Sequence, residues 1–214
     1  MKAVLEQLKD GIRKFQTEVY PKRAEAYRVA ATTPQKPHTL LITCADSRID
    51  PEAITSSVPG EIFVTRNVGN MVPAYGEMLG GVSAVIEYAV EALGVQHAVV
   101  CGHSDCGAMK GLLGSASALE SMPTVKSWLR NAAAALTVTQ SLAGDDAEPE
   151  ALVHSLTEQN VLLQLNHLRT HPSIAGGLAK GTLTVSGWVY DIEHGEVKIY
   201  DEVSNKFVPV SSGH

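Results

Sequence analysis

Apolar residues recur at helical spacing along the first part of the chain, with charged residues between them, until Pro34 and Pro37 intervene. The positions that keep this spacing are Val4, Leu5, Leu8, Ile12, Phe15 and Val19. The pattern predicts an amphipathic N-terminal helical arm over residues 1–33. Its apolar stripe would either dock on a partner subunit or cover the chain's own core, and we expect the second.

Three short apolar runs follow the arm and predict buried strands at Thr39–Thr43, Glu61–Thr65 and His97–Cys101. The second run begins after a Pro59-Gly60 turn. Between the second and third runs a helical period begins at Met78 and ends before Gly94. Its apolar positions are Val82, Val85, Ile86, Ala89 and Leu93. Strand, helix and strand at this spacing form a βαβ unit, so the sheet should be largely parallel.

Residues 122–140 and 151–170 have helical patterns separated by an acidic loop at 144–150, and Pro172 ends the second helix. Alternating residues predict two final strands at Thr182–Asp191 and Glu196–Asp201, joined by a His194-Gly195 turn. The fold class is therefore α/β, a single domain over residues 1–214. It has a mainly parallel β-sheet core flanked by helices, the N-terminal helical arm and a C-terminal antiparallel edge strand.

Charge and hydropathy exclude several partners. Seventeen Lys and Arg against 23 Asp and Glu give a net charge of −6 without a dense basic run, so we expect no nucleic-acid partner. Charged residues interrupt the first twenty positions, which argues against a signal peptide. No apolar run reaches the roughly 18 residues of a membrane span. We therefore expect a cytoplasmic protein with no membrane partner.

The chain has three cysteines, Cys44, Cys101 and Cys106. An odd number of cysteines without a secretory leader does not suit a set of disulfide bonds, so we consider metal ligation or thiol chemistry instead. Cys101 closes an apolar strand, and we expect it to point into the core. A redox thiol enzyme is disfavoured because Cys101 and Cys106 are separated by four residues rather than two.

Two predicted strands end in residues suited to a metal. The first continues into Cys44-Ala45-Asp46-Ser47-Arg48, and the third continues into a loop containing His103 and Cys106. Ligands of open parallel sheets bind beyond the carboxyl ends of the strands. If the two strands are neighbours, two thiolates and one imidazole meet in a site suited to zinc. His-x-x-Cys alone is common and would be weak evidence for a metal site. The zinc hypothesis rests on the presence of Asp46 and Arg48 at the same edge of the predicted sheet.

Nucleotide binding is excluded. Gly102 and Gly107 have the spacing of a phosphate-binding loop, but Ala108-Met109 stands where that loop needs Lys and Ser or Thr.

The sequence resembles the β-class carbonic anhydrases, in their plant-like subtype. Cys44-x-Asp46-x-Arg48 and His103-x-x-Cys106 are similar to the zinc signature of that family. The resemblance runs from about Gln35 to Tyr200. Further similar segments, in the same order, are Pro59-Gly60-Glu61, Arg66-Asn67-Val68-Gly69-Asn70, Glu87-Tyr88-Ala89-Val90 and Gly187-Trp188-Val189-Tyr190.

The resemblance implies reversible hydration of carbon dioxide to bicarbonate and a proton by a zinc-bound hydroxide, within a catalytic core over residues 38–201. Cys44, His103 and Cys106 would hold one Zn²⁺ per subunit. Asp46 would either accept a hydrogen bond from the hydroxide or ligate zinc itself, and Arg48 would decide between these roles. Because two thiolates reduce the charge of the metal, we expect activity to favour alkaline pH.

The resemblance also implies a substrate pocket lined by Phe63, Val68 and Tyr88, partly across a dimer interface, with the Gln35 amide bonding substrate. We assign Gly102 to the same substrate-binding set. Each of these residues has a structural alternative, as a core, helix-face, turn or loop position.

One departure concerns regulation. The subtype that bicarbonate inhibits at a non-catalytic site has tryptophan three residues before the first zinc cysteine, where this chain has Leu41. Arg66 and Tyr190 remain, but we predict no such regulatory site.

Other functions stay open. Relatives in the same family hydrolyse carbon disulfide or carbonyl sulfide, and a non-catalytic structural zinc protein would keep Asp46 as a permanent fourth ligand. The family implies a homodimer or homotetramer with the N-terminal helix reaching over a second subunit. The candidates for a proton shuttle are His38, His97, His154, His167, His171 and His194.

Overall fold

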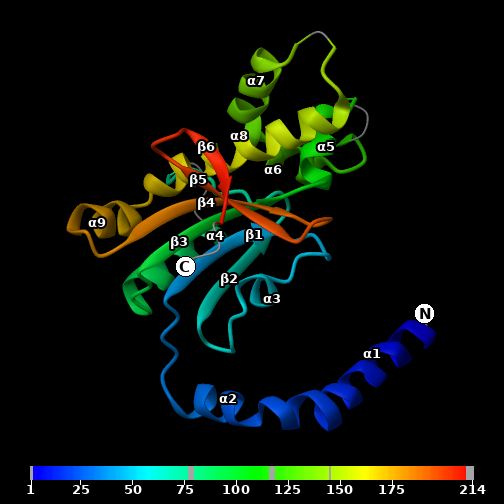
Figure 1. Ribbon diagram of the computed structural model, residues 1–214, viewed down its shortest axis with the longest axis vertical. Coiled ribbons are helices and arrows are strands. Elements are labelled where there is room, and N and C mark those ends of the chain that lie inside the picture. The colour runs from blue at the N-terminus through cyan, green and yellow to red at the C-terminus, as the bar shows by residue number, and fades with distance from the viewer. Residues whose placement is uncertain (1, 77–79, 116–118, 145, 211–214) are drawn as a thin grey trace.

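The computed structural model describes residues 2–76, 80–115, 119–144 and 146–210, and centres on one six-stranded sheet (Figure 1). Its strands are β1 (Thr39–Cys44), β2 (Ile62–Asn67), β3 (His97–His103), β4 (Thr184–Asp191), β5 (Glu196–Asp201) and β6 (Lys206–Pro209). The strand order is β2-β1-β3-β4-β5-β6. Neighbours from β2 to β4 are parallel, and β5 and β6 are antiparallel. The predicted fold class is confirmed, and β6 adds a strand beyond residue 201.

The helices described are α1 (Lys2–Lys14), α2 (Tyr20–Thr32), α3 (Pro51–Thr55), α4 (Gly81–Glu87), α5 (Gly107–Leu113), α6 (Pro123–Trp128), α7 (Ala133–Leu142), α8 (Pro149–Arg169) and α9 (Pro172–Lys180). A π-helical turn η1 (Phe15–Val19) joins α1 to α2, and another, η2 (Tyr88–Ala92), extends α4. The predicted helix at 122–140 is three consecutive pieces, because η4 (Leu129–Ala132) connects α6 and α7. The predicted start at Met78 lies outside the described residues.

The core forms where α8 packs on the central strands. All six residues of β1 are buried, and alternate side chains point to opposite faces of the sheet. The cluster on the α8 side includes Leu40, Ile42, Ala98, Val100, Val161 and Leu165. A smaller cluster on the other face contains Leu41, Val99 and Cys101. Cys101 is therefore a core residue, as the sequence predicted.

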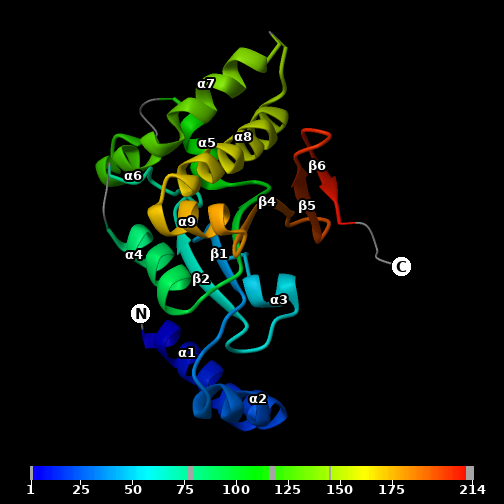
Figure 2. The ribbon, with the colours of Figure 1, turned by 90° about the vertical axis from the view of Figure 1, so that its left-hand side faces the viewer.

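The N-terminal arm extends away from the sheet (Figures 1 and 2). Val4, Leu8 and Ile12 are 62%, 63% and 57% exposed, so the apolar stripe of α1 does not cover the core of its own chain. The expectation that it would is wrong. Helical spacing defines an apolar face but carries no information about which molecule covers it.

The topology places the candidate ligands at one edge. Because β1 lies between β2 and β3, the carboxyl ends of these parallel strands are adjacent.

Within the described residues, none of the helices is both long and apolar enough to span a membrane.

Candidate metal centre

Cys44, His103 and Cys106 come together as the sequence predicted. Cys44 ends β1, His103 ends β3, and Cys106 caps the start of α5. All three are buried, and their ligand atoms lie within 4.8 Å of one another. Two sulfurs and one imidazole nitrogen at this spacing form a donor set typical of zinc.

The His103 ring is oriented for a cation. Its Nδ1 lies 2.8 Å from the Ser104 carbonyl oxygen, so Nδ1 carries the proton and Nε2 has a free lone pair. Among the described residues, the buried Nε2 finds no hydrogen-bond partner. A buried polar atom without a partner is destabilising, and a metal ion beside the two sulfurs would satisfy it. The residues present therefore fit zinc.

The two cluster sulfurs differ in acidity. A hydrogen bond from Cys106 lowers the pKa of the Cys44 thiol to about 4 against the opposing effect of burial, and the bond from the Gly69 N–H acts in the same direction. The Cys44 thiolate in turn raises the pKa of Cys106, and burial adds to this effect. Without a cation, the pair shares one proton.

Asp46 is held beside the cluster by Arg48. Arg48 Nε and Nη2 donate to the two Asp46 carboxylate oxygens at 2.9 and 2.8 Å, and the Arg48 backbone N–H adds a third bond at 3.0 Å. This bidentate pair keeps the pKa of Asp46 well below its usual range. Asp46 Oδ2 lies 3.9 Å from His103 Nε2, so the ionised carboxylate faces the place where a metal would bind.

Asp105 completes the hold on Arg48, and sequence reasoning missed it. Arg48 Nη1 donates to Asp105 Oδ2 at 2.8 Å, and Arg48 Nη2 donates to the Asp105 carbonyl at 3.2 Å. Asp105 also pairs with Lys110. Because Asp105 lies between two candidate ligands, the Arg48 guanidinium connects both ligand loops. Its place inside the His103-x-x-Cys106 motif was the available signal.

The end of β2 and the loop after it support Cys44 from the other side. Arg66 Nε donates to the Cys44 carbonyl at 3.0 Å, and its Nη2 donates to the Asp46 carbonyl at 2.5 Å. The Gly69 N–H donates to Cys44 Sγ at 3.4 Å. Arg66 therefore braces the backbone of the first ligand loop, a role that the sequence did not reveal.

Three of the predicted substrate residues, Phe63, Tyr88 and Gln35, do not lie around the cluster of their own chain. Phe63 pairs with Leu40, whereas Cys44 pairs with Asn67, which places Phe63 about 13 Å away along the strand direction. The Tyr88 ring lies beside that of Phe63, with ring centroids 6.0 Å apart and ring planes tilted by 44°, and Tyr88 is half-exposed. Gln35 is exposed before β1.

Val68 and Gly102 lie beside the cluster. Val68 precedes Gly69 and is 40% exposed. Gly102 immediately precedes His103, but a Cβ at Gly102 would lie 2.8 Å from Val161 and 3.0 Å from Thr157. The missing side chain thus permits close packing of α8, and substrate binding by Gly102 stays a prediction.

The histidines proposed as proton shuttles occupy different settings. His38 and His97 lie at the amino ends of the strands, opposite the cluster. His167 Nδ1 donates to the Val72 carbonyl at 2.8 Å, and His171 Nε2 donates to the Pro73 carbonyl at 3.1 Å. His154 and His194 are exposed beside Glu158 and Asp191.

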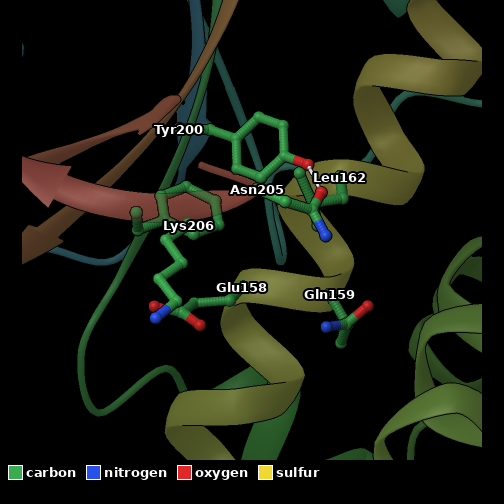
Figure 3. Close-up of a pocket in the computed structure, with 7 residues that line it drawn as sticks. Glu158, Gln159, Leu162, Tyr200, Asn205 and Lys206 are labelled. Carbon is green, nitrogen blue, oxygen red and sulfur yellow. Dashed lines mark hydrogen bonds between the residues drawn. The ribbon is translucent and has the colours of Figure 1, made fainter. Parts of the chain in front are cut away.

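A cavity of about 270 Å³ lies between α8 and the β5–β6 hairpin (Figure 3). Glu158 and Gln159 line it from α8, and Tyr200 and Lys206 line it from the strands. The Tyr200 hydroxyl donates to Asn205 within this cavity. None of its lining residues belongs to the metal cluster, so the cavity is separate from the candidate site.

Comparisons with known proteins place the chain in a family. The family model described as carbonic anhydrase matches residues 39–197. A carbonic anhydrase of Pseudomonas aeruginosa is 47% identical over 94% of this chain and 90% of its own length. The β-carbonic anhydrase CcaA has a TM-score of 0.92 and 40% identity, covering 98% of this chain and 93% of that one. One of two tetrameric β-carbonic anhydrases of Sordaria macrospora has a TM-score of 0.78 and 26% identity, covering 92% and 96%. The chain therefore belongs to the β-class carbonic anhydrases.

Proposed function

We propose that the protein hydrates carbon dioxide reversibly to bicarbonate and a proton, at one zinc ion per subunit held by Cys44, His103 and Cys106. The observation that carries this proposal is the buried cluster of two sulfurs with a His103 Nε2 that has no partner among the described residues. Zinc supplies a Lewis acid that lowers the pKa of a coordinated water, which provides a nucleophile for carbon dioxide.

The chain's own residues then orient the reaction. Asp46 presents an ionised carboxylate oxygen 3.9 Å from His103 Nε2, where it would accept a hydrogen bond from a metal-bound water. Arg48 binds both Asp46 oxygens and holds the carboxylate at this distance instead of letting it bind the metal. Asp105 holds Arg48 from its other side. This arrangement favours a catalytic site over a structural zinc site with Asp46 as fourth ligand.

The substrate pocket is completed by a second copy of the chain. Carbon dioxide is apolar, and Phe63 and Tyr88 lie too far along the sheet to line the pocket of their own subunit. We assign Phe63 and Tyr88 to the pocket of a neighbouring subunit. In that pocket they join Val68 of the subunit whose own Cys44, His103 and Cys106 form the metal cluster. Gln35 supplies an amide for the substrate. The exposed apolar stripe of the arm supports a homodimer or a homotetramer, and the similar Sordaria structures are described as tetrameric.

The test is stopped-flow hydration of carbon dioxide with metal analysis of the same samples, for the natural chain, Cys44→Ala and the control Cys101→Ala. We expect one zinc per subunit and high activity in the natural chain and the control, and loss of both in Cys44→Ala. Zinc without any rate above buffer would instead support a structural metal protein. Release of sulfide from carbonyl sulfide or carbon disulfide, without hydration activity, would reassign the substrate.

A further inference from the structure

The peptide group between Val68 and Gly69 is bonded on both sides. Its N–H donates to Cys44 Sγ at 3.4 Å. Its carbonyl oxygen accepts the indole N–H of Trp128 at 2.9 Å, across a sequence separation of 60 residues. A single planar peptide therefore connects Trp128, at the end of α6, to the sulfur of a candidate zinc ligand.

The position of this peptide is fixed by its surroundings. Gly69 has a φ of +78°, which glycine adopts readily and other residues rarely do. A Cβ at Gly69 would lie 2.9 Å from Met71 Cε and 3.0 Å from Ala108 Cβ. The Gly69 carbonyl also accepts a bond from Asn160 of α8 at 3.0 Å. The Asn160 bond holds the adjacent peptide, and rotation of the Val68–Gly69 peptide would break its bond from Trp128, so its N–H stays directed at Cys44.

Trp128 is itself held against the cluster. Its partly buried ring packs on the hydrophobic group that contains Cys44, Met71, Cys106 and Leu129. The indole N–H is thus placed by packing, and its bond to Val68 is the polar contact that links α6 to the ligand loop.

Two physical effects follow from this chain of bonds. An N–H donated to a metal-bound thiolate stabilises charge on sulfur and reduces electron donation to the metal. A peptide whose carbonyl already accepts a hydrogen bond is polarised, so its N–H becomes a stronger donor. Removing the indole N–H would therefore abolish the bond to the Val68 carbonyl and also weaken the bond from the Gly69 N–H to Cys44 Sγ.

We propose that Trp128 is a positioning residue of the metal centre, which acts through the Val68–Gly69 peptide to direct and strengthen the hydrogen bond on the Cys44 thiolate. The inference rests on the proposed function, since it requires that Cys44 binds the metal. It adds a residue outside both ligand loops to the set that adjusts that metal.

The test replaces zinc with Co²⁺, whose bonds to thiolates give a near-ultraviolet charge-transfer band. In Trp128→Phe the ring remains but the N–H is lost. The Cys44 sulfur then holds its electrons less tightly, and the band moves to longer wavelength. A Cys44 thiolate that has a weaker N–H bond is also protonated more readily, so we expect zinc to be released to a chelator about 10-fold faster, as for other residues that support metal ligands.

Trp188→Phe is the matched control. Trp188 is the other tryptophan of the chain, and within the described residues its buried indole nitrogen has no hydrogen-bond partner. The same chemical change there should leave the band and the release rate as in the natural chain. Where Trp128→Phe folds poorly, benzothienylalanine incorporated in the Trp188→Phe background replaces Trp128 alone and substitutes sulfur for its N–H without changing the ring shape.

An unshifted band and an unchanged release rate in the Trp128 variants overturn the proposal, and so does an equal shift in Trp188→Phe. A natural chain that takes up Co²⁺ with a thiolate band shows that the proposed metal site stands even if Trp128 has no effect on it. Failure of the natural chain to give any thiolate band would overturn both the metal site and this inference.

Discussion

The metal centre and the N-terminal arm differ in what each leaves unsatisfied. At the centre, bonds from Arg48, Arg66 and Gly69 occupy the acceptors around Cys44 and Asp46, while His103 Nε2 has no partner among the described residues. In the arm, the unsatisfied groups are apolar side chains such as Leu8 and Ile12. We expect a cation to satisfy the first region and a second protein surface to cover the other. Metal binding and assembly should therefore be separable by mutation.

The sharpest way to test the centre is Arg48→Ala. Without the guanidinium, Asp46 loses its bidentate partner and is free to move onto the metal, so we expect hydration activity to fall about 100-fold or more while zinc remains bound. Stopped-flow rates and metal analysis of the same sample measure this. Arg169→Ala, which breaks a surface pair with Glu202, is the control and should keep full activity. Full activity in Arg48→Ala would remove Arg48 from the mechanism.

The arm is tested by the double variant Leu8→Asp and Ile12→Asp. Burying two carboxylates in an apolar interface costs about 3 kcal/mol or more, which raises the dissociation constant of the oligomer about 100-fold. Sedimentation velocity across protein concentrations measures the change. Lys14→Glu adds negative charge to the same helix outside its apolar stripe and serves as the control.

If the double variant assembles as the natural chain does, the apolar stripe of α1 is not an interface. If it dissociates but still binds one zinc per subunit, the separation between centre and arm is confirmed.

The smallest expected effect is the pH dependence that Asp46 gives to stability. Arg48 lowers the pKa of Asp46 in the folded protein, so the pair stabilises the fold above the unfolded value of about 3.9, and this contribution disappears as pH falls through the lower folded value. Urea unfolding of zinc-free protein should show a constant difference between the natural chain and Asp46→Asn from pH 5 to pH 8. The difference should narrow below about pH 4.

Asp10→Asn removes a carboxylate that is 70% exposed beside Arg13, and it should give no measurable difference at any pH. A stability difference for Asp46→Asn that stays constant from about pH 5 down to about pH 2 would show that the Asp46 pKa is the same in the folded and unfolded protein and is not depressed.

The sequence was most informative where local pattern and tertiary environment agree. Thr39–Cys44 is a short apolar run that becomes a fully buried strand, and its terminal cysteine necessarily lies at the ligand edge of a parallel sheet. Which surface packs against the arm could not be predicted. The apolar stripe has the same sequence pattern whether it packs on the core of its own chain or on another subunit.

Other features escaped for different reasons. β6 is short and mostly exposed, with Phe207 as its one partly buried residue, so it has little hydrophobic pattern. The contact of Trp128 with Val68 depends on a backbone carbonyl 60 residues away, and residue types do not encode such a contact locally.

Helix α8 lies directly on two glycines, one in each of two adjacent strands. A Cβ at Gly102 would meet Val161, and a Cβ at Gly187 would lie 2.7 Å from Val161 and 2.8 Å from Leu165. These close approaches set the distance between α8 and the sheet. Asn160 and Gln164 on the same helix bond to the loop after β2 only at that distance. For protein engineering, Gly102, Gly187 and Val161 must be considered together. A larger side chain at any one of them would push α8 away from the sheet and displace the loop after β2 that contacts the metal centre.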